Sequence, residues 1–121
     1  MFLKLAKLKL HAYNTSLKLL LNGVAYMFLI SITYKTSLVE IDQHLGAHRE
    51  FLEKGYQNNY FIVSGPKNPR TGGIIISQLT NRQELEKILK DDPFVTHDLA
   101  DYEIVEFIPV KYHKDFAEFV T

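Results

Sequence analysis

The chain has 121 residues, 46% of them hydrophobic and 23% charged, which is ordinary for one globular domain with its own core. It contains no cysteine, which excludes a disulfide scaffold, a thiol nucleophile and a cysteine-ligated metal site. The formal net charge is zero, and the sequence has no basic stripe of the kind that nucleic-acid binding requires, so we expect no nucleic-acid partner.

The charge is unevenly distributed along the chain. The first 27 residues hold four lysines and no acid, whereas the remainder holds ten basic and fourteen acidic side chains. Residues 1–26 are therefore a basic N-terminal extension of unclear role. Three interpretations stay open: an extension upstream of a true start at Met27, a targeting segment, and an amphipathic helix that binds a partner. We expect no membrane association for residues 27–121.

The first two elements of the domain are a strand and a helix. Residues 28–34 are rich in aromatic and β-branched side chains, which predicts a buried strand. Ser37 then offers an N-cap, and Glu40 stands at the third position after it, which is the capping-box spacing. These signals predict a helix over 38–56.

Two further strands are predicted over 60–64 and 74–79. Gly65-Pro66 ends the first of them, because proline cannot donate a ladder hydrogen bond. The polar, basic residues 67–73 have turn chemistry and are expected to join the two strands into a hairpin.

The last part of the domain is predicted to contain a helix and a strand. Asn81 caps the helix, with Glu84 at the capping-box position. The helix is expected to end at Asp92-Pro93. A fourth strand is predicted over 102–110, followed by a short tail.

The order of these elements is βαββαβ, the ferredoxin-like arrangement of an α+β domain. It predicts an antiparallel sheet with both helices on one face. In the strands predicted over 28–34 and 102–110, apolar residues occur on both faces. The face of the sheet that the helices do not cover therefore also requires burial. We therefore expect a homodimer of the α+β barrel type, in which the open faces of two copies meet.

His48 is the leading candidate for chemistry. It shares a helical stripe with Ile41, Leu45 and Leu52, so its ring is predicted to face inward. Both ring nitrogens then require partners. One interpretation is a core histidine bonded to a backbone carbonyl, and the other is a general base.

Asp92 is the predicted partner of His48. An acid at the C-terminal end of a helix has the unfavourable sign for the helix dipole, which hints at another role. If the two helices lie side by side, Asp92 approaches His48, where a carboxylate fixes the imidazole tautomer and raises its basicity. The alternative is a helix end that points into water.

Three more residues are predicted to bind substrate. Ser64 and Gly65 close the second strand, where glycine permits close approach of the backbone. Arg70, with Lys67 on the same loop, is expected to hold an anion. The alternatives are a plain strand end and a solvated loop.

A metal site is not expected. His44 and His48 are four residues apart on the predicted helix, a spacing that can chelate a metal. No glutamate stands next to His44, however, and no third ligand is evident. The sequence also lacks a phosphate-binding glycine loop and a dinucleotide fingerprint. We predict no metal and no cofactor.

Four short motifs occur in a fixed order: His48-Arg49-x-Phe51-Leu52, Phe61-Ile62-Val63-Ser64-Gly65-Pro66, Gly72-Gly73-Ile74-Ile75 and Asp92-Pro93-Phe94. With these motifs, residues 27–121 resemble the YciI-like (YCII-related) family. The resemblance implies a ferredoxin-like dimer with a pocket that holds a His and an Asp, here His48 and Asp92. The family is similar in fold to muconolactone isomerase, and one class of members removes chloride from a chlorinated hydroquinone.

The favoured function is that of a small enzyme without a cofactor. His48, oriented by Asp92, would perform general acid/base chemistry on a small aromatic or anionic metabolite, as a lyase, an isomerase or a dehydrochlorinase does. The alternative is a module that binds a small ligand or a partner without chemistry. The expected location is the cytoplasm, and the substrate is not specified by the residues or by the family.

Overall fold

The computed structural model describes residues 26–120, so the prediction for residues 1–26 concerns a segment that lies, except for its last residue, outside the described part. The described elements are β1 (Met27–Tyr34), α2 (Leu38–Gln57), β2 (Phe61–Pro66), β3 (Gly72–Ser77), α3 (Arg82–Leu89), α4 (Pro93–Thr96), β4 (Ala100–Phe107) and the 3-10 helix η1 (Lys114–Phe119). Their order agrees with the predicted βαββαβ arrangement, with the second helix divided into α3 and α4.

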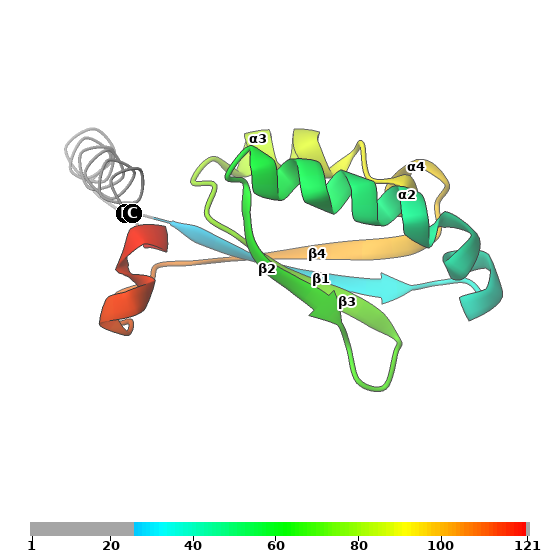
Figure 1. Ribbon diagram of the computed structural model, residues 1–121, viewed down its shortest axis with the longest axis horizontal. Helices are drawn as coiled ribbons and strands as arrows, with labels where there is room; N and C mark the ends of the chain where they lie inside the picture. Colours follow the sequence, from blue (N-terminus) through cyan, green and yellow to red (C-terminus); the bar gives the residue numbers. More distant parts are fainter. Residues whose placement is uncertain (1–25, 121) are drawn as a thin grey trace.

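The four strands form one antiparallel sheet in the order β2-β3-β1-β4, with β1 hydrogen-bonded to both β3 and β4. The helices α2, α3 and α4 all lie on the same face of this sheet (Figure 1). This arrangement confirms the ferredoxin-like α+β fold. Within residues 26–120, no helix is both long and apolar enough to cross a membrane.

Both predicted helix caps are confirmed. The Ser37 hydroxyl accepts a hydrogen bond from the backbone N–H of Glu40, and the Asn81 side chain accepts one from the N–H of Glu84. Each cap satisfies a donor that the first turn of a helix leaves without a partner. Asn59 follows α2 with a φ of 59°, a left-handed conformation that asparagine tolerates and that turns the chain toward β2.

The hydrophobic core lies between the sheet and the helices. Alternate residues of β1 point into it, as period 2 requires, and the helices contribute the opposite wall. Its most buried members are Phe28, Ile30, Ile32, Ile41, Ile75, Leu85 and Phe94. The core therefore anchors α2 and α4 against the same central strands.

The hairpin between β2 and β3 differs from the prediction at both strands. β3 begins at Gly72 rather than at residue 74, because Gly72 and Gly73 pair with Thr33 and Ile32 of β1. The two strands are so close there that a Cβ atom on Gly72 would lie 1.7 Å from the Ile32 carbonyl oxygen. β2 continues to Pro66, which is tolerated because β2 is an edge strand. The hairpin loop is therefore shorter than expected.

The placement of Asp92 at the end of the second helix was wrong. α3 ends at Leu89, and Asp92 is the N-cap of α4, where its side chain accepts a hydrogen bond from the Phe94 N–H at 3.1 Å. Pro93 favours this arrangement because the first position of a helix needs no N–H donor. The carboxylate thus has the favourable sign for the dipole of the helix that it begins.

Candidate functional site

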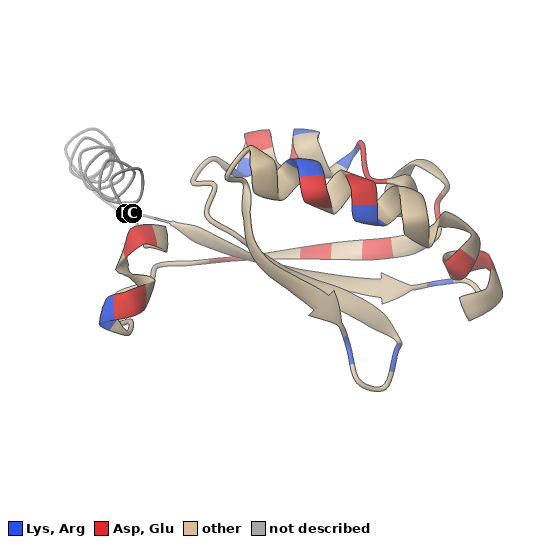
Figure 2. Ribbon diagram, in the orientation of Figure 1, with Lys and Arg blue, Asp and Glu red and all other residues tan. Residues whose placement is uncertain are grey.

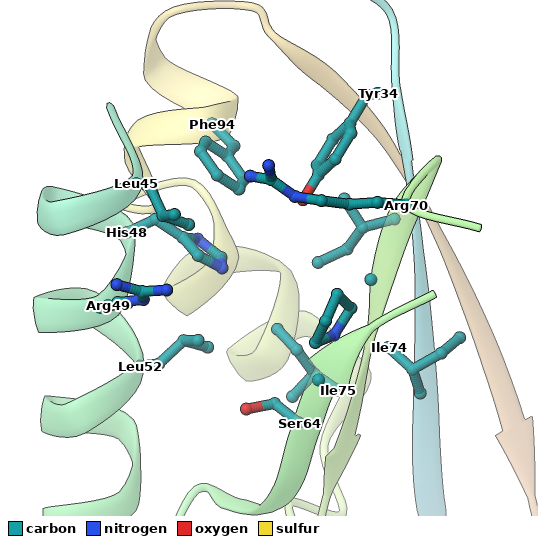
Figure 3. Close-up of a pocket in the computed structure, with 14 residues that line it drawn as sticks. Tyr34, Leu45, His48, Arg49, Leu52, Ser64, Arg70, Ile74, Ile75 and Phe94 are labelled. Atoms are coloured by element: carbon teal, nitrogen blue, oxygen red, sulfur yellow. The ribbon is translucent and has the colours of Figure 1, made fainter. Parts of the chain in front are cut away.

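A cavity of about 330 Å³ opens between α2, the β2–β3 hairpin and the start of α4. Figure 3 shows the side chains of α2 on one side of it and those of the sheet and hairpin on the other. Its walls are mainly aliphatic and aromatic, with a few polar groups that converge on the space, which is the usual composition of a small-molecule site.

His48 enters this cavity from α2. The predicted stripe is confirmed, and the residue is only 8% exposed. Its Nδ1 lies 2.8 Å from Asp92 Oδ1, and its ring stacks on Phe94 with a centroid distance of 4.0 Å and an interplanar angle of 10°. The hydrogen bond and the stacking together fix the direction in which the imidazole points.

Asp92 is fully buried and accepts three hydrogen bonds. The donors are the His48 Nδ1–H, the Phe94 backbone N–H and the Tyr102 hydroxyl. A buried carboxylate requires such donors. With Asp92 as the acceptor, the His48 proton of this hydrogen bond resides on Nδ1, and Nε2 is left to face another partner.

Tyr102 completes the back of the site from β4. Burial raises the pKa of its phenol, and the negative charge of Asp92 raises it further. The hydroxyl therefore remains a neutral donor to Asp92. Tyr102 was not among the residues predicted from the sequence. The alternation of side chains along β4 places it on the same face as Ile104, where its hydroxyl would need a hydrogen-bond partner.

The predicted substrate-binding residues of β2 line the cavity. The Ser64 hydroxyl shares a hydrogen bond with the Tyr56 hydroxyl, in which either oxygen can be the donor. Gly65 contributes only backbone, and a Cβ atom there would meet no atom within 4 Å. The packing of the protein therefore does not require a glycine at this position.

The two basic residues of the hairpin, Arg70 and Lys67, contact different partners. Arg70 lines the cavity, donates a hydrogen bond to Asp42 of α2, and has its guanidinium 6.0 Å from the centroid of the Tyr34 ring. The hydrogen bond from Arg70 lowers the pKa of Asp42. Lys67 is directed instead to the Thr33 hydroxyl, at 3.4 Å, and is absent from the described cavity wall.

Arg49 also lines the cavity, and it too was not predicted from the sequence. Arg49 follows His48 directly in the chain, within the same short motif. That position was the sequence feature that could have identified it as a site residue. In Figure 3 Arg49 and His48 both extend from α2, on the same side of the cavity.

His44 has partners different from those of His48. Its Nδ1–H donates to the Glu40 carbonyl oxygen at 3.2 Å, and its ring packs against His97 with a centroid distance of 4.3 Å. In the described part of the chain, no three His, Asp or Glu side chains come together as metal ligands would.

The fold and the site define a ferredoxin-like α+β domain with a cavity that contains a histidine–carboxylate pair. The model of the YCII-related domain matches residues 25–108, and the chain belongs to this family. No curated protein matches the chain.

Among solved structures, the chain is similar to 5-chloro-2-hydroxyhydroquinone dehydrochlorinase (TftG) from Burkholderia phenoliruptrix AC1100, in complex with 2,5-dihydroxybenzoquinone. The TM-score is 0.60 and the sequence identity is 20%, over 74% of this chain and 97% of that chain. This likeness shows that the two proteins share a fold.

Proposed function

We propose that the protein is a cofactor-independent enzyme in which His48, oriented by Asp92, transfers a proton on a small aromatic or anionic metabolite. One observation carries the proposal: a buried imidazole has its Nδ1–H bonded to a buried carboxylate, while its ring lines a 330 Å³ cavity. Such a pairing is that of a general base. The proposal keeps the predicted cytoplasmic location.

The proposed step begins with Nε2 of His48 as the acceptor. It takes a proton from a C–H or O–H group of the substrate, and the released electron pair moves onto a conjugated oxygen or expels a leaving group. The resulting imidazolium lies 2.8 Å from Asp92, whose negative charge stabilises it. In an isomerisation the proton returns to another atom of the substrate, and in an elimination it leaves to water.

Ser64, Gly65 and Arg70 would hold the substrate on the side opposite His48. Ser64 keeps a donor or acceptor for the ligand even while it is bonded to Tyr56, because a hydroxyl has one proton and two lone pairs. The relative with bound 2,5-dihydroxybenzoquinone supports a planar oxygenated ring as the class of compound to test first.

The decisive experiment measures proton transfer on the substrate itself, so the product need not be identified. Hydroxylated aromatics and lactones are incubated in D₂O with the protein, and the loss of substrate C–H signals is followed by NMR. We expect His48→Asn to lower exchange at least about 100-fold. The matched control is His44→Asn, four residues earlier on α2 and outside the cavity wall formed by residues 26–120. Equal exchange by His48→Asn and the parent would reject the proposal.

Asp92 is tested by the tautomer of His48. In Asp92→Asn the amide can donate to Nδ1, so we expect ¹⁵N shifts to report a proton on Nε2, with slower exchange. Asp91→Asn, a change at the exposed neighbouring residue, is the control. A ligand that binds without any exchange dependent on His48 would indicate a binding module instead.

The proposal includes a homodimer formed through the open face of the sheet. A row of paired apolar residues crosses this face from β2 to β4: Val63, Ile76, Leu29 and Val105. The two outer residues of the row, Val63 and Val105, are 53% and 44% exposed. Figure 2 shows acidic positions along β4, and exposed apolar residues stand at its end and directly after it, namely Phe107, Ile108 and Val110. A contiguous apolar surface of this kind favours pairing with a second copy.

A further inference from the structure

Two arginines line the cavity, and their charges are compensated differently. Arg70 is paired with Asp42, so the two together carry no net charge. Arg49 forms no ion pair or hydrogen bond with an acid in the part of the chain that the structure describes, and its charge is only a minor contributor to the lowered pKa of Asp42. The uncompensated positive charge of the cavity is therefore that of Arg49.

We propose that Arg49 selects the ligand by charge, and that the ligand is a planar monoanion with a carboxylate or enolate oxygen at Arg49. The inference rests on the proposed function, because it names the substrate class of the same site. Figure 3 shows Arg49 and His48 on the α2 side of the cavity and Arg70 on the hairpin side, where its guanidinium lies 6.0 Å from the Tyr34 ring centroid. An anion at Arg49 is thus held on the same wall of the cavity as the imidazole that would take the proton.

The surrounding charges favour one negative charge on the ligand. No Asp or Glu belongs to the cavity wall built from residues 26–120. The nearest buried acid in the site, Asp92, lies behind His48 and is occupied by three donors. A monoanion would find one cation without a partner, whereas a second negative charge would have to compete with Asp42 for Arg70.

The size and surface of the cavity favour a single ring. A dry cavity of about 150 Å³ is enough to hold benzene, so 330 Å³ holds one ring with small substituents. Leu45, Leu52 and Phe94 supply apolar walls for such a ring. Arg49 is exposed, so the anionic group would keep contact with water at the mouth of the cavity.

The position of Arg49 on the same cavity wall as His48 also suits the proposed chemistry. Removal of a proton adds negative charge to the substrate, and that charge moves onto an oxygen conjugated with the reacting carbon. A guanidinium that already holds this oxygen stabilises the added charge where it develops. The inferred substrate is therefore a ring whose anionic or carbonyl oxygen is conjugated with the acidic position.

The test compares benzoate with its neutral analogue benzamide, using NMR titration of the full chain. We expect the parent to bind benzoate at least about tenfold more tightly than benzamide. Arg49→Gln should lose this preference, and Arg49→Lys should restore part of it. Asp42→Asn releases Arg70 and should strengthen benzoate binding about threefold. Arg82→Gln is the control, because Arg82 pairs with Glu86 on α3, away from the cavity wall.

Three results would overturn the inference: equal binding of benzoate by Arg49→Gln and the parent, equal binding of benzoate and benzamide by the parent, and binding of neither. The proposed function fails separately. If the exchange that depends on His48 is intact but Arg49→Gln binds benzoate normally, only the charge selection is wrong. If Arg49→Gln loses benzoate but no compound exchanges through His48, the charge selection stands and the enzymatic proposal is wrong.

Discussion

Two neighbouring rows of side chains cross the same strands on opposite faces of the sheet. On the helix side the row is Ser64, Ile75, Ile30 and Ile104, and on the open side it is Val63, Ile76, Leu29 and Val105. Their composition is similar, yet Ile30 and Ile75 are at most 1% exposed, whereas Val63 is 53% exposed. The strands therefore offer two apolar faces, and the helices cover only one of them.

The two faces also differ in what their polar groups do. On the covered face, His48, Asp92 and Tyr102 satisfy one another in a buried network, so each has a defined direction. On the open face, the exposed apolar row requires no such network. The comparison predicts that a charge on the open face changes association, whereas changes on the covered face alter the stability and the site.

The largest expected effect is on the open face. Val105→Glu places a charge in the proposed interface twice, by two-fold symmetry, and should weaken the dimer by about 5 kcal/mol or more. Light scattering after size exclusion would then report a folded monomer. The control is Val39→Glu, a change at an exposed residue of α2, which should leave the mass of the dimer in solution unchanged. A parent that is already monomeric at high concentration would refute the dimer.

The next effect is in the covered core. Phe94 is buried, stacks on His48 and meets the Tyr34 ring edge-on at 5.8 Å. Phe94→Ala should lower the free energy of unfolding by about 3–5 kcal/mol, because it leaves a cavity under the imidazole. Val39→Ala should change it by less than about 0.5 kcal/mol. Similar denaturant midpoints for the two variants would contradict the assigned core.

A smaller effect is expected at the back of the site. Tyr102→Phe removes the phenol donor from Asp92 and should lower the free energy of unfolding by about 1.5–3 kcal/mol, as for a hydrogen bond to a charged group. Tyr112→Phe is the matched control, since Tyr112 is 47% exposed. Urea unfolding of both variants measures the difference, and equal midpoints would mean that the Tyr102 bond is unimportant.

The smallest effect is a pH dependence at alkaline pH. The pKa of the Tyr102 phenol is higher in the folded protein than its unfolded value of about 10. Its contribution to stability is therefore complete below about pH 10 and declines as the pH rises above that value, because the unfolded chain releases the proton first. The stability difference between the parent and Tyr102→Phe should narrow above about pH 10. A constant difference would contradict this sign.

Much of the fold could be predicted because its signals are local. The caps at Ser37 and Asn81 and the inward stripe of His48 follow from spacings of a few residues within one element. Where the structure differs from the prediction, the cause is a contact or an element boundary that the local sequence does not specify. Gly72 belongs to β3 because it pairs with Thr33 of β1. The Asp92-Pro93 sequence is locally compatible with the end of one helix or the start of the next.

The sequence by itself determined the order of elements, the face on which His48 lies and the presence of two apolar faces, because periodicity and capping act over one or two helical turns. Only the tertiary structure decided which groups meet. His48 reaches Asp92 across 44 residues, Tyr102 reaches the same carboxylate from β4, and Asp42 compensates Arg70 rather than Arg49. These contacts depend on how helices and strands pack across long separations, and a local pattern does not specify that packing.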